Sequence, residues 1–439
     1  MKKRVISALL AATMVTGVAG GNLGSISANA DGAEKVLTIP TYWTGENVTA
    51  VYFEAAVDRF NEQYEGQYEV VIEEVIEHQH MEKMTQLAQT GNLPVLVTSP
   101  SAEFIETVII PNHLYTDMSD FLEEHPEIKE LALDASLEYC TQENGEIVGM
   151  PGVALTPVGS YYNTALYNPD KNIADMTMDE FLDSFGDNKY AFQTGDNAWT
   201  SMLFLSALIA NEEGGTEWLL ENEGSKTSDF NQPFIVDAVA KLQEFWSTNA
   251  ADNSLGAAYP DCANAFMSNN AAVIFNGSWM NSEFGADNTD SWSNGFDGAN
   301  VKSDIFPGNI AIGSTKGYGR YLMTNSGTED EREVAYAFLA FIYSQYELEQ
   351  YSLTDGAMIP NLDYSDEYMA TLEANPLVKS RTELVSGDTT VVPHIANIMY
   401  DSIAGEVLPT TLVQLVNGAV TPEEFCQILT EKSIEAADE

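Results

Sequence analysis

Residues arranged for catalysis are hard to find in this chain. The sequence contains no G-x-S-x-G elbow, no H-E-x-x-H pair, no Walker loop and no G-x-G-x-x-G after a predicted strand. His78 and His80 lie beside Glu77 and Glu82, a spacing that could bind a metal ion, but we favour a solvated polar segment at a strand end. Acidic residues are so numerous that no single pair indicates glycoside hydrolysis.

Aromatic residues at the ends of predicted elements are a better signal. Trp43 follows a predicted strand at 36–40, and a Thr-Ser-Pro-Ser turn at 98–101 follows another short strand. Trp199 precedes an apolar helix at 201–210. In sheets of this kind, ligands bind beyond the carboxyl ends of the strands. Rings and short polar side chains at such ends therefore favour a binding site.

Alternating strands and helices must position these residues. The helical spacing of Phe53, Val57 and Phe60 predicts a helix that ends before Gly66, and a β-rich run follows at 68–76. Strands that alternate with helices predict a mostly parallel sheet covered on both faces. Three Thr/Glu pairs predict helix starts with capping boxes: Thr177 with Glu180, Thr328 with Glu331, and Thr421 with Glu424.

Length, charge and cysteine content indicate an exported protein of two domains. The chain has 439 residues, which suits two domains. Its formal net charge of −49 argues against binding to nucleic acid or anionic lipid, and we interpret it as a solubilising surface. Residues 1–30 have the pattern of a signal peptide, ending in the cleavage site Ala28-Asn29-Ala30. Cys140, Cys262 and Cys426 allow at most one disulfide, and we expect three buried thiols.

Several motifs occur in a fixed order along the chain after residue 30. Residues 145–151 read Gly-Glu-Ile-Val-Gly-Met-Pro, residues 161–167 read Tyr-Tyr-Asn-Thr-Ala-Leu-Tyr, and residues 356–360 read Gly-Ala-Met-Ile-Pro. In this order they resemble the extracellular solute-binding proteins of bacterial ABC importers, in carbohydrate-binding family 1 (maltose-binding-protein-like). Two departures are Val148, where Tyr is usual, and Gly21, where the lipid-attachment box needs Cys.

This resemblance implies a fold class and a domain division. The fold is α/β, the two-lobed periplasmic-binding-protein fold, in which each lobe is a mixed sheet flanked by helices. Three hinge crossings are expected near 151–155, 314–320 and 356–360. The expected division is a signal peptide at 1–30, an N-lobe of 31–152 plus 320–358, and a C-lobe of 153–319 plus 359–439.

The resemblance also implies a function. The protein would capture a carbohydrate, an oligosaccharide above all, between its lobes and deliver it to the permease subunits of an ABC importer. It would be a monomer outside the cytoplasm, periplasmic or at the cell surface, with no enzymatic activity, cofactor or metal. A sugar ring needs aromatic faces for its C–H groups and planar polar groups for its hydroxyls. The expected ligand-binding residues are Trp43, Glu46, Tyr161, Tyr162, Trp199, Asn276, Trp279 and Arg320.

Two alternatives stay open. The same fold could bind a polyamine, a peptide or a metal ion, and the acidic composition makes a cationic ligand reasonable. A secreted enzyme acting on polysaccharide would instead require two carboxyl groups that face each other across the site.

Overall fold

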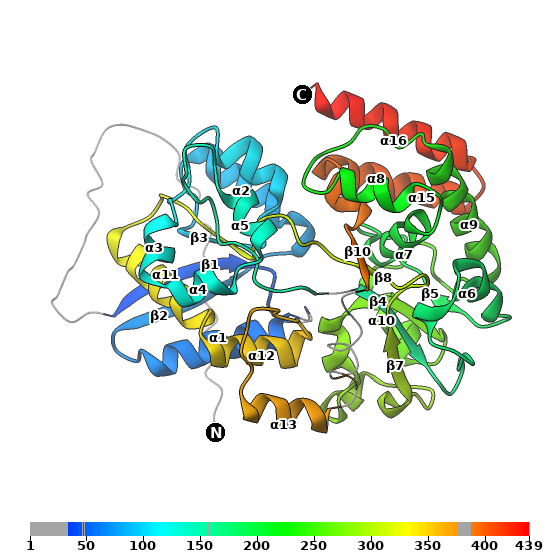
Figure 1. Ribbon diagram of the computed structural model, residues 1–439, viewed down its shortest axis with the longest axis horizontal. Coiled ribbons are helices and arrows are strands. Elements are labelled where there is room, and N and C mark those ends of the chain that lie inside the picture. Colours follow the sequence, from blue (N-terminus) through cyan, green and yellow to red (C-terminus); the bar gives the residue numbers. More distant parts are fainter. Residues whose placement is uncertain are drawn as a thin grey trace, which may run out of the picture.

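The computed structural model describes residues 34–45, 47, 49–156, 158–375, 377, 379 and 388–438, and the backbone alone of His78, Ala286 and Asp287. The predicted signal peptide and Glu46 lie outside the described residues. Figure 1 shows two lobes that lie side by side and are joined by extended segments. Among the described residues, no helix combines the length and the apolar character needed to cross a bilayer.

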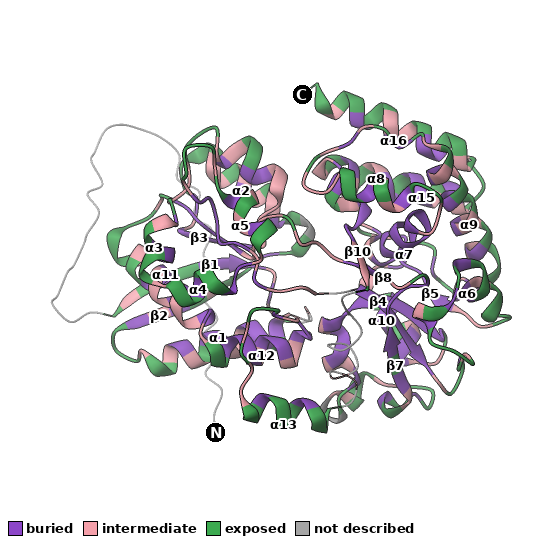
Figure 2. Ribbon diagram, viewed as in Figure 1, coloured by how far each residue is buried: buried purple, intermediate pink, exposed green. Residues whose placement is uncertain are grey.

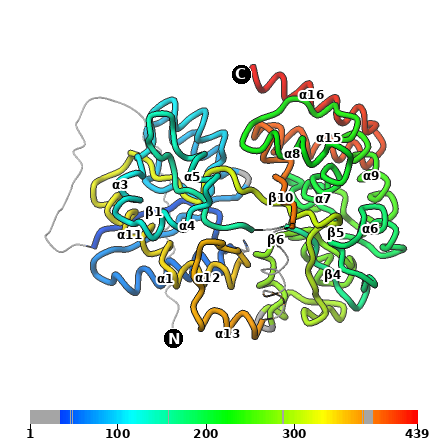
Figure 3. Tube along the Cα trace, in the orientation of Figure 1, coloured from blue at the N-terminus to red at the C-terminus, as the bar shows by residue number. Residues whose placement is uncertain are grey.

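The first lobe contains two small sheets covered by helices (Figures 1 and 3). Its strands are β1 (Lys35–Thr41), β2 (Tyr68–Glu74), β3 (Leu96–Thr98) and β9 (Tyr321–Met323). Its helices are α1 (Ala50–Gln63), α2 (His80–Thr90), α3 (Ser119–Glu124), α4 (Pro126–Leu131), α5 (Asp134–Cys140), α11 (Glu329–Ile342), α12 (Gln345–Asp355) and α13 (Asp366–Ala374). Strand β1 pairs with β2 in parallel, whereas β3 and β9 are antiparallel.

The second lobe is built on one six-stranded sheet. Its strands are β4 (Val158–Asn163), β5 (Tyr190–Ala191), β6 (Val273–Gly277), β7 (Val301–Asp304), β8 (Ile310–Ile312) and β10 (Thr390–Val392). Its helices include α6 (Met178–Ser184), α7 (Trp199–Ala210), α8 (Gly215–Glu221), α9 (Pro233–Asn249), α10 (Tyr259–Met267), α15 (Leu408–Val416) and α16 (Pro422–Ala437). The strand order is β10-β8-β4-β6-β5, and β7 also pairs with β4.

The prediction of mostly parallel strands is wrong for β4, which runs antiparallel to β6, β7 and β8. The cause lies in where the chain enters the sheet. Val158, the first residue of β4, lies opposite Gly277 at the end of β6 and opposite Ile312 at the end of β8. The chain that crosses from the first lobe therefore enters β4 at the edge of the sheet where β6 and β8 end. The segments that follow β6 and β8 leave the sheet at this same edge.

Each lobe has its own hydrophobic core, and Figure 2 shows buried strands beneath helices with exposed outer faces. In α1 the predicted face is confirmed, because Phe53, Val57 and Phe60 are all buried. Helix α7 is buried all round, with every residue from 200 to 210 inside the second lobe. Cys140, Cys262 and Cys426 are free and buried, as expected. All three predicted capping boxes are confirmed.

The crossing segments are bonded to one another where they leave the lobes. The Gly319 amide donates to the Met150 carbonyl over 2.8 Å, and Leu155 and Met358 exchange two backbone hydrogen bonds of 2.7 and 2.8 Å. The domain boundaries predicted above stay a prediction. However, Ile359 is fully buried in the first core, and α13 packs on α12. The chain from Ile359 to the end of α13 therefore packs with the first lobe.

The capping boxes lead to a stability prediction. The Thr328 hydroxyl accepts from the Glu331 amide over 3.2 Å, and the Glu331 carboxylate accepts from the Thr328 amide over 2.7 Å. Thr328→Ala leaves the Glu331 amide of α11 without its partner, so we expect a loss of about 1 kcal/mol in urea unfolding. Thr371→Ala is the control, because that hydroxyl donates only to the Glu367 carbonyl inside α13. Equal losses in both variants would contradict the prediction.

Candidate ligand-binding site

Strand ends of the first lobe bring a polar turn next to an arginine. The Thr98 hydroxyl donates to the Thr41 hydroxyl over 3.0 Å, which ties the end of β3 to the end of β1. The Ser99 amide donates to the Arg320 carbonyl over 2.7 Å, and the Tyr42 hydroxyl donates to Ser99 Oγ over 3.0 Å. The turn after β3 and the residue before β9 are therefore fixed in position together.

Arg320 lies between two aromatic rings. Its guanidinium is 4.2 Å from the centre of the Trp43 ring and 4.2 Å from the centre of the Tyr351 ring. Trp43 is buried against Phe53 of α1 and Tyr321 of β9. The predicted ring after β1 therefore holds a cation in place, and the attraction of each pair increases as water is excluded.

A cavity of about 260 Å³ lies beside Arg320. Its walls include the crossing segments at 152–154 and 314–320, together with Ser99 and Pro100. Five tyrosines contribute to the lining: Tyr52, Tyr318, Tyr321, Tyr343 and Tyr351. The Tyr321 hydroxyl is buried and has no hydrogen-bond partner among the described residues. The cavity therefore combines aromatic residues with the basic side chains of Lys316 and Arg320.

A second group of rings lies at the sheet edge of the other lobe. Trp199, Trp279 and His394 pack together, with ring centres 5.4 Å apart for the two tryptophans and 5.8 Å apart for Trp199 and His394. Both tryptophans are partly exposed. Burial lowers the pKa of His394 to about 4, so its imidazole is neutral near pH 7, and its Nε2 has no partner among the described residues.

The Trp279 segment also contacts the first lobe. Trp279 lies in the short helix η4 (Ser278–Phe284), which packs against α12. Gly356, just after α12, has a φ of +64°, and a Cβ there would lie 2.4 Å from Ser278 Cβ. Only glycine allows this close approach of the lobes. The two ring groups are therefore on elements that meet each other.

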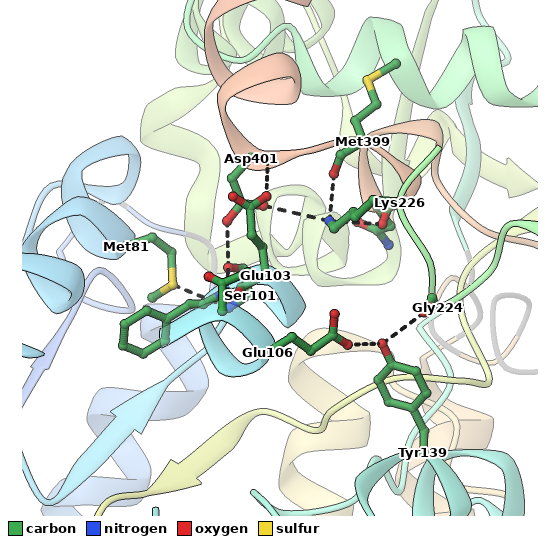
Figure 4. Close-up of polar contacts among 12 residues, drawn as sticks. Met81, Ser101, Glu103, Glu106, Tyr139, Gly224, Lys226, Met399 and Asp401 are labelled. Carbon is green, nitrogen blue, oxygen red and sulfur yellow. Dashed lines mark hydrogen bonds and ion pairs between the residues drawn. The ribbon is translucent and has the colours of Figure 1, made fainter. Parts of the chain in front are cut away.

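Hydrogen bonds also join the lobes on a second side, as Figure 4 shows. Ser101 Oγ donates to Asp401 Oδ2 over 2.7 Å, and the Asp401 amide donates to the Glu103 carboxylate over 2.5 Å. Lys226 Nζ is 3.9 Å from Asp401 Oδ1. Burial raises the pKa of Glu103, because its charged form is desolvated and Asp401 carries a like charge nearby. Tyr139 adds a hydrogen bond to the Gly224 carbonyl over 3.1 Å.

The structure divides the predicted site residues into three groups. In the first group, Arg320 lines the cavity and the Trp43 ring stacks on the Arg320 guanidinium, while Trp199 and Trp279 form the ring group of the other lobe. Glu46 is outside the described residues. The remaining three are buried inside the second lobe: Tyr161, Tyr162 and Asn276.

The buried residues are held by interior contacts. The Tyr161 hydroxyl donates to Asn281 Oδ1 over 2.6 Å, and Asn276 Nδ2 donates to the Tyr259 hydroxyl over 2.9 Å. Tyr162 packs in the main core of the lobe. In this conformation none of them has an exposed face for a ligand, and we propose that they support the edge that carries Trp279.

The sequence patterns gave no indication of Tyr351, His394 or Lys316. Tyr351 lies on α12, a polar-looking helix whose Glu347 and Asp355 are nevertheless buried. No spacing rule distinguishes such a residue from a surface tyrosine. For the cavity wall next to Lys316, the one available signal was Gly-Tyr-Gly-Arg at 317–320. Glycines beside a charged residue often mark a place where the backbone comes close to a ligand.

Two lobes that are joined by bonded crossings and present aromatic groups to each other define a two-lobed binding protein. The chain belongs to the bacterial extracellular solute-binding proteins, because the model of this family matches residues 55–380. No curated protein matches the chain.

Solved structures share the fold at low sequence identity. A chitin oligosaccharide binding protein superposes with a TM-score of 0.72 and 19% identity, covering 92% of this chain and 99% of its own. A Streptococcus pneumoniae solute-binding protein in complex with the blood group A-trisaccharide gives 0.68 and 17%, covering 90% and 98%. A protein from a study of xylan utilization by Caldanaerobius polysaccharolyticus gives 0.71 and 17%, covering 90% and 99%.

Asp355 beside the site leads to a prediction about pH. Burial raises the pKa of Asp355 to about 7, although the Arg320 charge and a hydrogen bond with Thr49 act in the opposite direction. In the unfolded chain the pKa is about 4, so between pH 4 and 7 the folded state binds the extra proton. This group therefore stabilises the fold at low pH, and its contribution is lost as the pH rises to 7.

We expect Asp355→Asn to become more stable relative to the parent as the pH rises from 4 to 7, by an amount on the order of 4 kcal/mol. Asparagine retains the shape and the contact with Thr49 but has no proton to lose. Urea unfolding at several pH values measures the difference. Asp58→Asn, on the exposed face of α1, is the matched control. A difference that does not change with pH would rule out this role for Asp355.

The contacts around Asp401 lead to a prediction about closure. Asp401→Ala removes the acceptor for Ser101 and the neighbour of Lys226, so the lobes lose a bond that spans them. We expect a larger radius of gyration by small-angle X-ray scattering without ligand. Asp179→Ala is the control, because that carboxylate pairs with Lys241 inside the second lobe over 3.5 Å. An unchanged scattering curve for Asp401→Ala would show that these contacts do not hold the lobes together.

Proposed function

We propose that the protein captures a carbohydrate between its lobes and delivers it to the permease of an ABC importer. The observation that carries the proposal is a ring group on each lobe, Trp43 and Tyr351 around Arg320 in the first and Trp199 with Trp279 in the second, together with the contact between α12, which carries Tyr351, and η4, which carries Trp279. Aromatic faces bind the C–H side of a sugar ring, and charged or hydroxyl groups bind its edge. Family membership and the sugar ligands named for the similar structures support the same ligand class.

The mechanism we propose is a shift between open and closed lobes. The crossings are short segments that can absorb rotation, and a ligand that touches both ring groups binds the closed form better than the open form. The closed form would then dock on the permease outside the cytoplasm, after removal of residues 1–30. Because no bond is broken, tight binding of the ground state is useful here, unlike in an enzyme.

The other classes have weaker support. Among the described residues, no group of three or more His, Cys, Asp or Glu side chains is placed to hold a metal ion. None of the described residues that line the cavity is an aspartate or glutamate. A glycosidase requires two such groups facing each other, and a polyamine site also depends on acidic side chains. The cavity lining therefore favours neither alternative.

Thermal unfolding against a panel of mono- and oligosaccharides tests the proposal, with polyamines and divalent ions as controls. A ligand at a hundred times its Kd adds about 2.7 kcal/mol to the free energy of unfolding, so a measurable rise in Tm is expected with one sugar class. The sugar should be recovered unchanged. A rise only with polyamines or metal ions would contradict the carbohydrate assignment, and cleaved sugar would identify an enzyme.

A pair of tryptophan variants locates the binding. Trp279→Phe reduces the ring surface in the second group and should weaken the Tm rise for the same sugar. Trp246→Phe is the control, because that ring packs edge-to-face on Phe192, with ring centres 4.6 Å apart, and does not belong to the ring group. An equal effect of both variants would place the sugar elsewhere.

A further inference from the structure

The charge of the cavity is opposite to that of the protein. The chain has 67 acidic residues and 18 Lys plus Arg. Of the described residues that line the cavity, two are basic, Lys316 and Arg320, and none is acidic. In a chain with this composition, a random set of lining residues would contain more acidic than basic side chains. A locally cationic cavity therefore indicates a ligand with negative charge.

Arg320 has no carboxylate partner. Among the described residues, none lies within 4.0 Å of its guanidinium. The nearest source of negative charge is Asp355, which acts on Arg320 from outside the cavity lining. Burial raises the pKa of Asp355 to about 7, so near neutral pH it is only partly ionised. Among the described residues, the positive charge of Arg320 therefore has no carboxylate partner at ion-pair distance.

The stacking of Arg320 determines which of its groups a ligand can use. The Trp43 and Tyr351 ring centres each lie 4.2 Å from the guanidinium carbon, and the Tyr351 hydroxyl takes one of its hydrogen bonds. The N–H groups lie in the plane of the guanidinium. Two parallel N–H groups in one plane match the two oxygens of a carboxylate or similar oxyanion, an arrangement that a lysine cannot provide. The rings also prevent the side chain from turning away.

Lys316 is the second cation and lies at the crossing. Its Nζ is 5.7 Å from the centre of the Tyr139 ring, and no described carboxylate lies within 4.0 Å of it. Two acidic residues lie in this region: Glu106, which accepts from the Tyr139 hydroxyl, and Glu223, whose Oε1 accepts from the Thr315 amide over 3.1 Å and from the Ser314 hydroxyl over 2.7 Å. Each carboxylate is thus bonded to a neighbour other than the Lys316 ammonium group.

From these observations we propose that the ligand is an acidic sugar whose oxyanion pairs with Arg320, with Lys316 as a second contact. The proposal rests on the carbohydrate function above and names the class of carbohydrate. The volume of about 260 Å³ is at the lower end for small-molecule sites, which suits one ring-sized unit.

Calorimetry with matched ligands tests the proposal on the protein without residues 1–30. Digalacturonate is compared with its methyl ester, glucuronate with glucose, and glucose 6-phosphate with glucose. We expect at least about a tenfold tighter Kd for the charged member of one pair, the size of a charge-assisted hydrogen bond. A carboxylate preference identifies a uronate, and a phosphate preference identifies a sugar phosphate.

Variants assign the preference to Arg320. In Arg320→Gln the preference for the charged member should fall to the smaller part that Lys316 supplies, and in Arg320→Lys the preference should fall less. Lys316→Gln, on the exposed crossing, should weaken the charged member by a smaller factor and keeps the test valid if Arg320→Gln fails to fold. Arg332→Gln is the matched control, because that guanidinium donates to the Ser326 and Gly327 carbonyls before α11.

Each result has one interpretation. Equal binding of acidic and neutral sugars by the parent protein would overturn the acidic-sugar proposal and leave the carbohydrate function standing. A charge preference that is undiminished in both Arg320→Gln and Lys316→Gln would show that these two cations are not the anchor. Binding of none of the sugars, with a response only to polyamines or metal ions, would overturn both this proposal and the carbohydrate function.

Discussion

The structure depends on a cation that packs against aromatic rings where the chain crosses between the lobes. Arg320 ends the second crossing and precedes β9, and its carbonyl accepts from the Ser99 amide. Its side chain packs between a ring from the end of β1 and a ring from α12. The guanidinium suits this position because it is weakly hydrated and stacks on both faces. One residue thus fixes the turn after β3, the position of α12 and one wall of the cavity.

A second constraint is that both lobes place their functional side chains on the same kind of edge. In the second lobe, β4 begins where β6 and β8 end, so the incoming crossing and the Trp279 segment are neighbours. In the first lobe, the end of β1 and the end of β3 are tied by Thr41 and Thr98. A rotation about the crossings therefore moves two rigid edges against each other. The hydrogen bond between Ser101 and Asp401 joins the two lobes in the conformation described.

Local features could be predicted from the sequence, and features that depend on distant partners could not. The capping boxes at Thr177, Thr328 and Thr421 need only four consecutive residues, and all three form. The order of motifs indicated the family and the two-lobed fold. By contrast, the direction of β4 depends on strands more than a hundred residues away. The burial of α12 could not be predicted from its sequence pattern. Its buried Glu347 pairs with Arg59 of α1 over 2.6 Å, so the buried positions of this helix do not follow an apolar period.

The acidic surface and the cationic cavity act on a ligand over different distances. With 67 acidic residues the outer surface repels anions, but at physiological salt this field falls off within about 8 Å. At the cavity wall two rings pack against the Arg320 guanidinium, so its charge is screened less than that of a fully solvated side chain. An anionic ligand would therefore meet a modest barrier outside and a strong attraction inside. Such an arrangement disfavours anions that are too small to contact the rings as well as the cation, because they gain the attraction without the ring contacts that a sugar makes.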